Sequence, residues 1–452
     1  MTAFDAIVIG AGQAGPSMAV RLAQSGKKVA VIERKLLGGT CVNYGCMPTK
    51  TLVASARAAH AARTGSTYGI QIAGNIGIDM PTVKARADTV TLNARQGLQD
   101  WLSHTDNLTL IEGHARFEDA KTISVNGERH TAERFFLNVG GRPTVPPIDG
   151  IDTVDYLTST SILGLSAVPR HLAIIGGSYI ALEFAQMYRR FDADVTIIER
   201  GDRLAPREDA DISAAIEDIL ASEGIAIHKN AKDVSARKDG ADIAISINGL
   251  TTITPSHLLV ATGRAPNTHD LGLDKAGVKT GKRGFIEVDD RLSTNIEGIW
   301  ALGDCNGRGA FTHTSYNDFE IAAANLLDGG DRKVSDRVPA YALYIDPPLG
   351  RVGMTETEAR ATGRKIVVST RPMTRVGRAV EKGETKGFMK AVADAETKQI
   401  LGAAILGVEG DEAIHGILDM INAKAPYPVL QWAVPIHPTV SELIPTLIGD
   451  LK

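Results

Sequence analysis

The chain has 452 residues, with 46 glycines, 3 cysteines and a formal net charge of -4 at pH 7. This length exceeds what one hydrophobic core serves and predicts about three domains of roughly 150 residues each. The small negative charge argues against nucleic acid as a partner. The sequence shows no leader-like segment and no apolar stretch of about 18 residues, so we expect a cytoplasmic protein without a membrane partner.

The first predicted element is a nucleotide-binding unit at the N-terminus. An apolar strand at Asp5–Ile9 leads through a glycine-rich turn into an amphipathic helix, and a second strand at Lys28–Ile32 ends at an acid. The glycines permit a tight turn and close approach of a pyrophosphate to the helix N-terminus, and the acid can accept ribose hydroxyls. The residues assigned to this site are Gly10, Gly12, Gly15 and Glu33.

Two of the three cysteines follow this unit in the segment from Gly38 to Lys50. Cys41 and Cys46 precede an apolar helical stretch, and such a pair can close a disulfide across the first turn of a helix. Because the pair comes just after a nucleotide-binding unit, it is predicted to be a redox dithiol beside a flavin. Helix N-termini and cations such as Lys50 lower thiol pKa values, which prepares the pair for electron transfer. Two unpaired buried thiols, a structural disulfide and half of a zinc site are the alternatives, although no second Cys/His pair follows.

A second nucleotide-binding unit is predicted from Leu172–Ile175 onward. Its turn begins at Gly176 and its second strand ends at Glu199, the same spacing as from Gly10 to Glu33. Two copies imply two dinucleotides, with a copy that binds nothing as the alternative. Ser178 stands where the second glycine is expected, and Ala181 is an allowed variant at the third.

The nicotinamide preference of this second site stays open at the level of sequence. Glu199 favours NADH through the ribose diol, whereas Arg200 and Arg203 could pair with the extra phosphate of NADPH.

Turns after apolar strands occur at Gly140-Gly141 and at Gly263, near the edges of the second unit. They are predicted to mark the crossovers where one domain is inserted into another, and Gly263 is counted among the candidate cofactor contacts. Further along, Gly298–Asp304 is predicted to be a strand ending in an acid. Asp304 could accept hydrogen bonds from a ribityl chain or cap a loop.

With these residues in place, the chain resembles the FAD-dependent pyridine nucleotide-disulfide oxidoreductases, which include dihydrolipoyl dehydrogenase, glutathione reductase and mercuric reductase. The motifs GGTCVNYGCMPTK, GGSYIALEFA, ALGDC and HPTVSE carry the resemblance, which covers essentially the whole length. It implies an α/β protein with two Rossmann-like domains for FAD and NAD(P) and a C-terminal α+β dimerisation domain, assembled as a homodimer. The implied domains are residues 1–147 (first part of the FAD-binding domain), 148–264 (inserted NAD(P)-binding domain), 265–335 (second part of the FAD domain, or central domain) and 336–452 (C-terminal interface domain).

The resemblance also implies roles for individual residues. Cys46 would contact the flavin and Cys41 would be the thiol that meets substrate, while Lys50 would lie by the flavin and pair with Glu183. His437 and Glu442 would form a proton-transfer couple that reaches the active site of the partner subunit, with a histidine packed at the dimer interface as the alternative. Thr40 and Asp304 join the four residues of the first unit as FAD contacts, and the nicotinamide-nucleotide contacts are Gly176, Ser178 and Glu199.

Within the family, the chain is most similar to the mercuric-reductase-like and reactive-chlorine-resistance branch. Its last residues, Ile448–Lys452, contain no cysteine pair of the kind with which mercuric reductases hand over Hg(II), which favours thiol–disulfide chemistry. The leading hypothesis is an NAD(P)H-dependent flavoenzyme that reduces a small-molecule or protein disulfide, or a soft metal ion, without a resident metal. Dihydrolipoyl dehydrogenase is the second enzyme hypothesis, and a redox-sensing or metal-binding module with little turnover is the third. Cys305 is expected to be a buried bystander.

Overall fold

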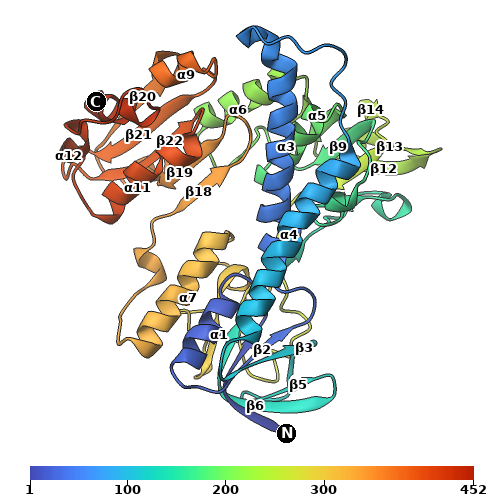
Figure 1. Cartoon of the computed structure of the whole chain (residues 1–452), viewed down its shortest axis with the longest axis vertical. Helices are drawn as coiled ribbons and strands as arrows, with labels where there is room; N and C mark the ends of the chain where they lie inside the picture. Colours follow the sequence, from blue (N-terminus) through green and yellow to red (C-terminus); the bar gives the residue numbers. More distant parts are fainter.

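The first nucleotide-binding unit is built on a mixed sheet whose central, parallel strands are nearly continuous apolar runs. The computed structural model describes residues 1–452. Ile7 and Val8 have no exposed surface, as expected for parallel strands with both faces covered. Helices α1 (Gly15–Gln24) and α7 (Thr312–Leu327) pack together beside this sheet (Figure 1). The strands lie in the order β3 (Leu108–Glu112), β2 (Val29–Glu33), β1 (Thr2–Ile9), β6 (Glu128–Leu137), β5 (Thr122–Val125) and β4 (Arg116–Phe117), with β17 (Ile299–Ala301) also paired to β6.

The second unit repeats the arrangement of the first. Strand β9 (His171–Ile175) leads into α5 (Tyr179–Arg190), and the chain returns in β10 (Asp194–Ile198), which pairs in parallel with β9, so the predicted repeat is confirmed. Its sheet has the order β11 (Ala226–His228), β10 (Asp194–Ile198), β9 (His171–Ile175), β15 (His257–Val260) and β8 (Leu157–Thr158). The unit also holds α6 (Ala210–Ser222) and a small antiparallel sheet of β12 (Val234–Asp239), β13 (Asp242–Ile247) and β14 (Thr251–Ile253).

The chain enters and leaves the second unit through two short strands that pair with each other. β7 (Gly141–Pro143) and β16 (Arg264–Pro266) form an antiparallel two-stranded sheet, with Ala265 opposite Arg142. The turns at Gly140-Gly141 and Gly263 therefore lie side by side. The second unit is an insertion between these two strands.

The predicted active-site helix is two helices rather than one. Cys41 lies in α2 (Gly39–Tyr44) and Cys46 begins α3 (Cys46–Thr64), with Gly45 between them at φ -139° and ψ -116°. The prediction of a cysteine pair across the first turn of a single helix is therefore wrong, because the chain bends at Gly45. α3 and α4 (Met80–Ser103) then run together through the middle of the molecule, from the first unit toward the other two (Figure 1).

The C-terminal domain is an antiparallel sheet with helices, which completes the predicted α/β and α+β organisation. The strands lie in the order β18 (Ala340–Leu343), β19 (Leu349–Gly353), β22 (Ile400–Leu406), β21 (Phe388–Asp394) and β20 (Ile366–Pro372). The helices are α8 (Glu356–Ala361), α9 (Gly377–Glu381), α10 (Gly410–Ala413), α11 (His415–Asn422), α12 (Pro428–Gln431) and α13 (Ile444–Gly449).

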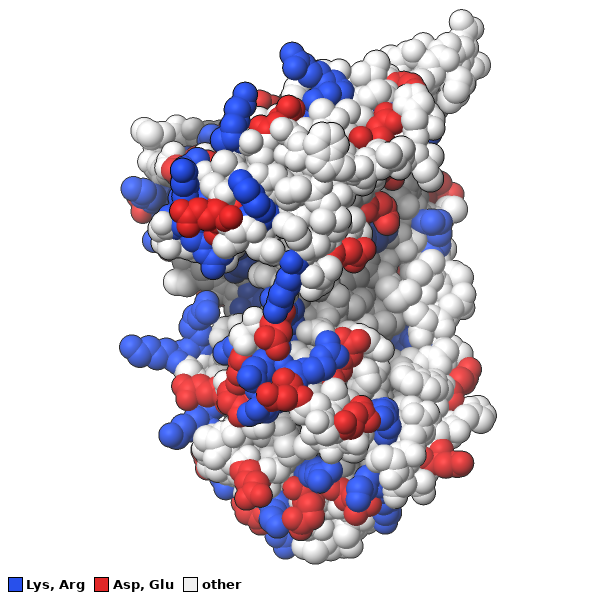
Figure 2. Space-filling model, turned by 90° about the vertical axis from the view of Figure 1, so that its left-hand side faces the viewer, with Lys and Arg blue, Asp and Glu red and all other residues white.

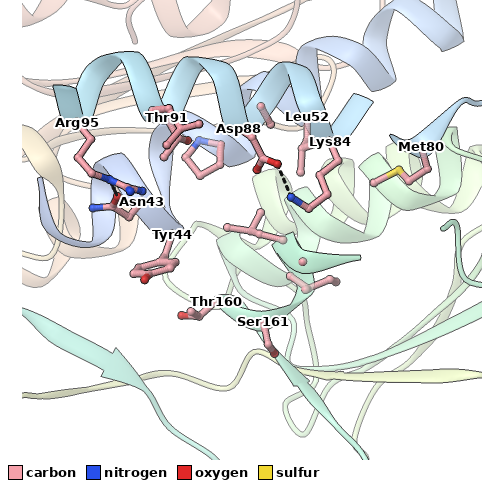
Figure 3. Close-up of a pocket in the computed structure, with 16 residues that line it drawn as sticks. Asn43, Tyr44, Leu52, Met80, Lys84, Asp88, Thr91, Arg95, Thr160 and Ser161 are labelled. Carbon is pink, nitrogen blue, oxygen red and sulfur yellow. Dashed lines mark hydrogen bonds and ion pairs between the residues drawn. The ribbon is translucent and has the colours of Figure 1, made fainter. Parts of the chain in front are cut away.

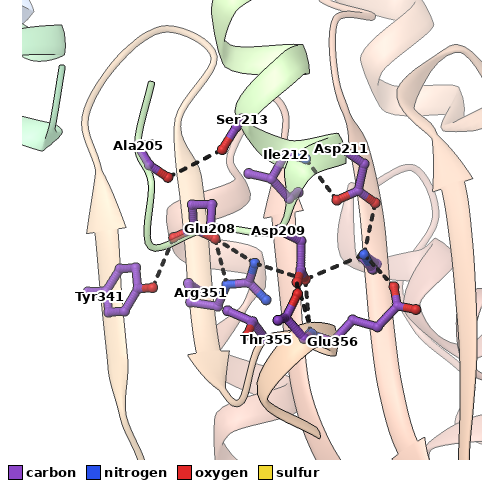
Figure 4. Close-up of polar contacts among 12 residues, drawn as sticks. Ala205, Glu208, Asp209, Asp211, Ile212, Ser213, Tyr341, Arg351, Thr355 and Glu356 are labelled. Carbon is purple, nitrogen blue, oxygen red and sulfur yellow. Dashed lines mark hydrogen bonds and ion pairs between the residues drawn. The ribbon is translucent and has the colours of Figure 1, made fainter. Parts of the chain in front are cut away.

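A buried ionic cluster joins the second unit to the C-terminal domain (Figure 4). Glu208, in the loop before α6, accepts hydrogen bonds from Arg351 Nε (3.0 Å) and from the hydroxyls of Tyr179 (2.5 Å) and Tyr341 (2.9 Å). The side chains of Glu208 and Arg351 are 0% and 1% exposed. Such a pair is costly to bury and strongly destabilising to break, so the cluster fixes the two domains relative to each other.

The surface agrees with the composition. On the face shown in Figure 2, Lys and Arg side chains lie among Asp and Glu side chains, and the face is hollowed at mid-height. No helix combines the length and the apolar character needed to cross a membrane.

Candidate active site

One large cavity of about 740 Å³ brings most of the predicted site residues together. It runs from the first fingerprint, past the cysteine segment, to the start of α5 in the second unit. Every predicted residue of the first site lines it except Gly15, which lies buried behind the turn. The lining includes Gly10, Gly12, Glu33, Thr40, Cys41, Cys46, Lys50, Glu183 and Asp304.

The glycines of the first fingerprint are required by close backbone packing. A Cβ atom on Gly10, where φ is +100°, would lie 2.3 Å from the carbonyl oxygen of Asn138, and one on Gly15 would lie 2.1 Å from the carbonyl oxygen of Gly10. Asn138 ties the turn together, because its Oδ1 accepts the N–H of Gly15 (3.0 Å) and its Nδ2 donates to Leu302 O (2.9 Å). The turn is therefore tight and free of side chains, which is the shape that the pyrophosphate of the expected FAD requires.

Glu33 ends β2 at the edge of the cavity and is held by the backbone. Its Oε2 accepts the N–H of Ala11 (2.8 Å) and its Oε1 accepts the N–H of Lys35 (2.9 Å). Asp304 lines the same cavity, where burial raises its pKa and the nearby Arg264 opposes this rise. Asp304 lies in a short 3₁₀ turn after β17 rather than at the strand end itself. These carboxylates fit an adenosine ribose and a ribityl chain, so the donor and acceptor set agrees with bound FAD.

The two active-site cysteines are thiols with different acidities. Hydrogen bonding from Cys41 is the largest influence that lowers the pKa of Cys46, to about 6. Thr312 Oγ1, 3.2 Å from Cys46 Sγ, and the charge of Lys50 lower it further. The same hydrogen bond, together with burial, raises the pKa of Cys41. The surroundings therefore favour the thiolate at Cys46 and the protonated thiol at Cys41.

Lys50 and Glu183 form an ion pair beside Cys46. Lys50 Nζ lies 2.7 Å from Glu183 Oε2, so the contact expected from the sequence is present between α3 and α5. Burial acts to lower the pKa of Lys50, but Glu183 raises it above its usual value, and Lys50 stays charged. The Glu183 side chain is only 6% exposed.

The second fingerprint has the backbone of a nucleotide site but does not itself line the cavity. A Cβ atom on Gly176, where φ is +120°, would lie 2.6 Å from Ala261 O. Glu199 Oε1 accepts the N–H of Gly201 (2.6 Å), two residues on, as Glu33 does with Lys35 in the first unit. Ser178 precedes α5 without capping it.

The remaining predicted contacts of the second site lie farther from the fingerprint turn or point elsewhere. Arg200 is exposed, and Arg203 donates to Pro206 O (3.3 Å). Gly263 lies in the crossover turn, where its carbonyl accepts the N–H of Thr144. None of the three contacts Glu199 through a hydrogen bond or ion pair of the structure.

His437 and Glu442 lie together but outside the cavity. His437 Nδ1 is 2.7 Å from Glu442 Oε2, and the His437 side chain is 78% exposed. The segment before it carries the exposed apolar side chains of Trp432, Val434 and Ile436. Within one chain, therefore, this couple does not meet the cysteines.

A smaller cavity of about 390 Å³ lies behind the cysteine segment, between α4 and Thr160–Gly164 (Figure 3). Arg95 Nε donates to Asn43 Oδ1 (2.9 Å), which fixes the residues between the two cysteines. Tyr44 lines both this cavity and the large one. Cys305 is fully buried and its thiol donates to Leu137 O, in keeping with a bystander.

Several site residues were not predicted from the sequence. Thr312 stands at the start of α7, and Tyr344 follows β18 and lines the cavity. Asn138 follows β6 directly, and Arg264 donates to Gly141 O and Thr40 Oγ1. A polar residue directly after an apolar strand was the available signal for Asn138. Thr312 and Tyr344 carried none, because their partners are distant in the sequence.

Comparison with known proteins places this geometry in a family. Residues 4–318 match the model of the pyridine nucleotide-disulphide oxidoreductases, and residues 339–448 match the dimerisation domain of the same family. The probable pyridine nucleotide-disulfide oxidoreductase RclA of Escherichia coli is 36% identical, with both chains covered in full. A mercuric reductase of Lysinibacillus sphaericus is 34% identical (94% of this chain, 80% of the relative), and a dihydrolipoyl dehydrogenase of Chlamydia muridarum is 33% identical (98% and 95%).

The fold agrees with a solved structure of such a relative. The Cu(II) complex of the HOCl-induced flavoprotein disulfide reductase RclA from Escherichia coli superposes with a TM-score of 0.92 at 35% identity, and both chains are covered in full.

Proposed function

The chain belongs to the pyridine nucleotide-disulphide oxidoreductase family, and we propose that its Cys41–Cys46 pair carries electrons from NADH to a disulfide or a soft metal ion. It is an enzyme of the flavoprotein disulfide reductase type, which works with FAD and NAD(P)H. The observation that supports the proposal most is the place of Cys46, which lies 3.2 Å from Thr312 Oγ1 and lines, together with Cys41 and Lys50, a cavity that both nucleotide units share.

The protein residues divide the chemistry between them. Bound in the cavity beside Gly10, Gly12 and Glu33, FAD would supply the two-electron chemistry that links the nicotinamide to the cysteine pair. Lys50 places a positive charge where the reduced cofactor gains negative charge, and Glu183 holds that lysine in place. Cys46 is stabilised as a thiolate by Cys41, Thr312 and Lys50.

Cys41 is the thiol that attacks an acceptor disulfide. Because its pKa is raised, it must give its proton to a base before it attacks. The attack forms a mixed disulfide with one acceptor sulfur and releases the other as a thiol. The Cys46 thiolate then displaces the bound sulfur, so that the Cys41–Cys46 disulfide forms and a second acceptor thiol leaves.

We propose that His437 of a second copy is that base. The match to the dimerisation domain supports a homodimer, and the exposed apolar segment before His437 supports its burial against another copy. Glu442 fixes the imidazole through Nδ1 and leaves Nε2 to take the proton from Cys41 and return it to the leaving thiol. The domain limits 1–147, 148–264, 265–335 and 336–452 are proposed together with this assembly.

NADH is the proposed reductant because of Glu199. The backbone holds its carboxylate at the end of β10, beneath the Gly176-Gly177 turn, as Glu33 is held in the first unit. A carboxylate there accepts both ribose hydroxyls and repels a 2′-phosphate. The exposed Arg200 is not paired with Glu199 and so does not offset this repulsion.

The test is an anaerobic assay of the FAD-loaded protein with NADH or NADPH against lipoamide, glutathione disulfide, Cu(II) and Hg(II). Limited reduction should produce a long-wavelength thiolate-to-flavin absorption band that is abolished in Cys46→Ser. Cys305→Ser is the matched control, because that thiol is buried away from the cavity and should leave the band intact. A reduced wild-type protein without the band would refute the role of Cys46.

His437→Ala separates the two half-reactions. Reduction of the enzyme by NADH should keep its rate, whereas disulfide turnover should fall by a factor of about 10² to 10⁴, the usual range for a lost general base. Unchanged disulfide turnover would refute the role of His437.

Dihydrolipoyl dehydrogenase activity is the second candidate. The His437–Glu442 contact favours it, because oxidation of a dithiol needs the same base. Rapid NAD⁺-dependent oxidation of dihydrolipoamide would promote it, and no turnover would remove it. A sensor module with negligible turnover against every acceptor is the remaining alternative.

A further inference from the structure

Tyr344 contacts both members of the ion pair beside Cys46. Lys50 Nζ lies 4.7 Å from the centroid of the Tyr344 ring, within the range of a cation–π interaction. The backbone N–H of Tyr344 donates to Glu183 Oε1 (3.0 Å), the carboxylate oxygen that Lys50 leaves free. Tyr344 also lines the large cavity. One residue of the C-terminal domain thus touches a lysine on α3 and a glutamate on α5.

We propose that Tyr344 is a positioning residue, which holds the Lys50 ammonium at the redox centre through the face of its ring. Lysine ends in a compact charge on a flexible four-carbon stem, and Glu183 alone fixes that charge at one point. The ring supplies a second contact from a different direction. This inference rests on the proposed function, because it takes Lys50 to act on the flavin and on Cys46.

Tyr344 can hold Lys50 only if its own segment is held, and the structure anchors that segment on both sides. Before it, the Tyr341 hydroxyl donates to the buried Glu208 (Figure 4). After it, the backbone N–H of Asp346 donates to Gln186 Oε1 (2.7 Å), and Gln186 Nε2 donates back to Asp346 O (2.8 Å).

The anchors lie along one face of α5. Four residues of α5 follow one another at the spacing of a single helix face and meet the segment from Tyr341 to Asp346: Tyr179 through its ring, which packs against that of Tyr341, and Glu183, Gln186 and Arg190 through hydrogen bonds. Arg190 closes the row with an ion pair to the Asp346 carboxylate at 2.5 Å. The segment therefore cannot shift along α5 without breaking buried polar contacts.

The pKa of Cys46 depends on the position of the Lys50 charge and can be used to measure it. Lys50 lowers the pKa of Cys46, so a lysine that is free to move away should leave a less acidic thiol. Loss of a cation–π contact at a partly exposed site lowers the preference of the ammonium for its place by a factor of about 3. This factor limits the change in the ratio of thiolate to thiol at Cys46 to about threefold, which is about half a pH unit.

The experiment compares FAD-loaded, full-length Tyr344→Phe, Tyr344→Leu and Tyr344→Met. The phenyl ring keeps the aromatic face, and the two aliphatic variants remove it independently, so that a folding defect in one leaves the other. Tyr156→Leu is the control, because Tyr156 is 36% exposed, against 37% for Tyr344, and does not line the cavity. The readouts are the pH midpoint of the long-wavelength band after anaerobic reduction and the midpoint potential of the flavin.

The aliphatic variants should raise the pH midpoint by about half a unit and make the potential more negative, whereas Tyr344→Phe and Tyr156→Leu should match the wild type. Wild-type values in both aliphatic variants would overturn the inference. So would an equal shift in Tyr344→Phe, because the hydroxyl would then be responsible. A wild-type protein without the band would instead refute the proposed function, so the two failures are distinguishable.

Discussion

Breaking the buried pair of Glu208 and Arg351 should destabilise the protein more than any surface ion pair can. In Arg351→Met, the carboxylate keeps two tyrosine hydroxyls but loses its counter-charge at a site with no exposed surface. Removing one partner of a buried pair costs about 3–5 kcal/mol. Glu208→Gln should cost less than this, because Asp209 lies 3.9 Å from Arg351 and can partly compensate the guanidinium.

The double variant Glu208→Gln/Arg351→Met tests whether the two charges act as a pair. It leaves no uncompensated charge, so its loss should be smaller than that of Arg351→Met alone, about 1–2 kcal/mol for the disrupted hydrogen bonds. The assay is urea unfolding followed by far-UV circular dichroism, at fixed protein and FAD concentrations because bound cofactor adds to stability.

A matched control uses an exposed pair of the same residue types. Arg129 Nε lies 2.7 Å from Glu118 Oε2, with side chains 52% and 35% exposed, and Arg129→Met should cost less than about 1 kcal/mol. A double variant whose loss equals the sum of the two single losses would refute the coupling. An Arg351→Met variant as stable as Arg129→Met would refute the burial argument itself.

Three further predictions address the cofactor sites. At pH 7 the long-wavelength band should have about nine-tenths of its full intensity, and it should fade as the pH drops through about 6, because protonation removes the Cys46 thiolate. A spectrophotometric titration with a midpoint near pH 9 would contradict this prediction. In steady-state kinetics, Glu199→Ala should raise the KM for NADH about tenfold and leave kcat little changed. The ratio of kcat/KM for NADH to that for NADPH should fall. Gly10→Ala should abolish FAD retention, measured as flavin content after gel filtration, because its Cβ would meet Asn138 O; Gly26→Ala, with φ of +83° and open space around it, should retain FAD.

The sequence predicted those parts of the site that are carried by local motifs. Both nucleotide units, with their glycine turns and terminal acids, follow from spacing within about two dozen residues. The contact between Lys50 and Glu183 followed only from the resemblance to the family. The bend at Gly45 was missed, because the run from Thr40 to Lys50 has no proline before position 48 and is otherwise compatible with one helix.

Contacts between distant segments could not be predicted in the same way. Tyr344 and Glu183 lie 161 positions apart, and Arg351 and Glu208 lie 143 apart. Nothing local distinguishes Arg351 from an exposed arginine, and only the packing of two domains makes it one of the most buried side chains. The sequence therefore predicted the binding turns but not the side chains that hold the domains around them.

Because the strands β7 and β16 pair with each other, the second nucleotide unit is joined to the rest of the fold at two neighbouring points and could be exchanged as a whole. Its two connections leave the parent fold as neighbours, so a homologous unit with another coenzyme preference could be grafted at Arg142 and Ala265 without altering the distance between the cut ends. A graft would succeed only if it also brought a glutamate at 208 and an arginine at 190, the residues that seat the module on the C-terminal domain. Exchange of this unit is thus limited by its contacts with the C-terminal domain and not by its two connections to the first unit.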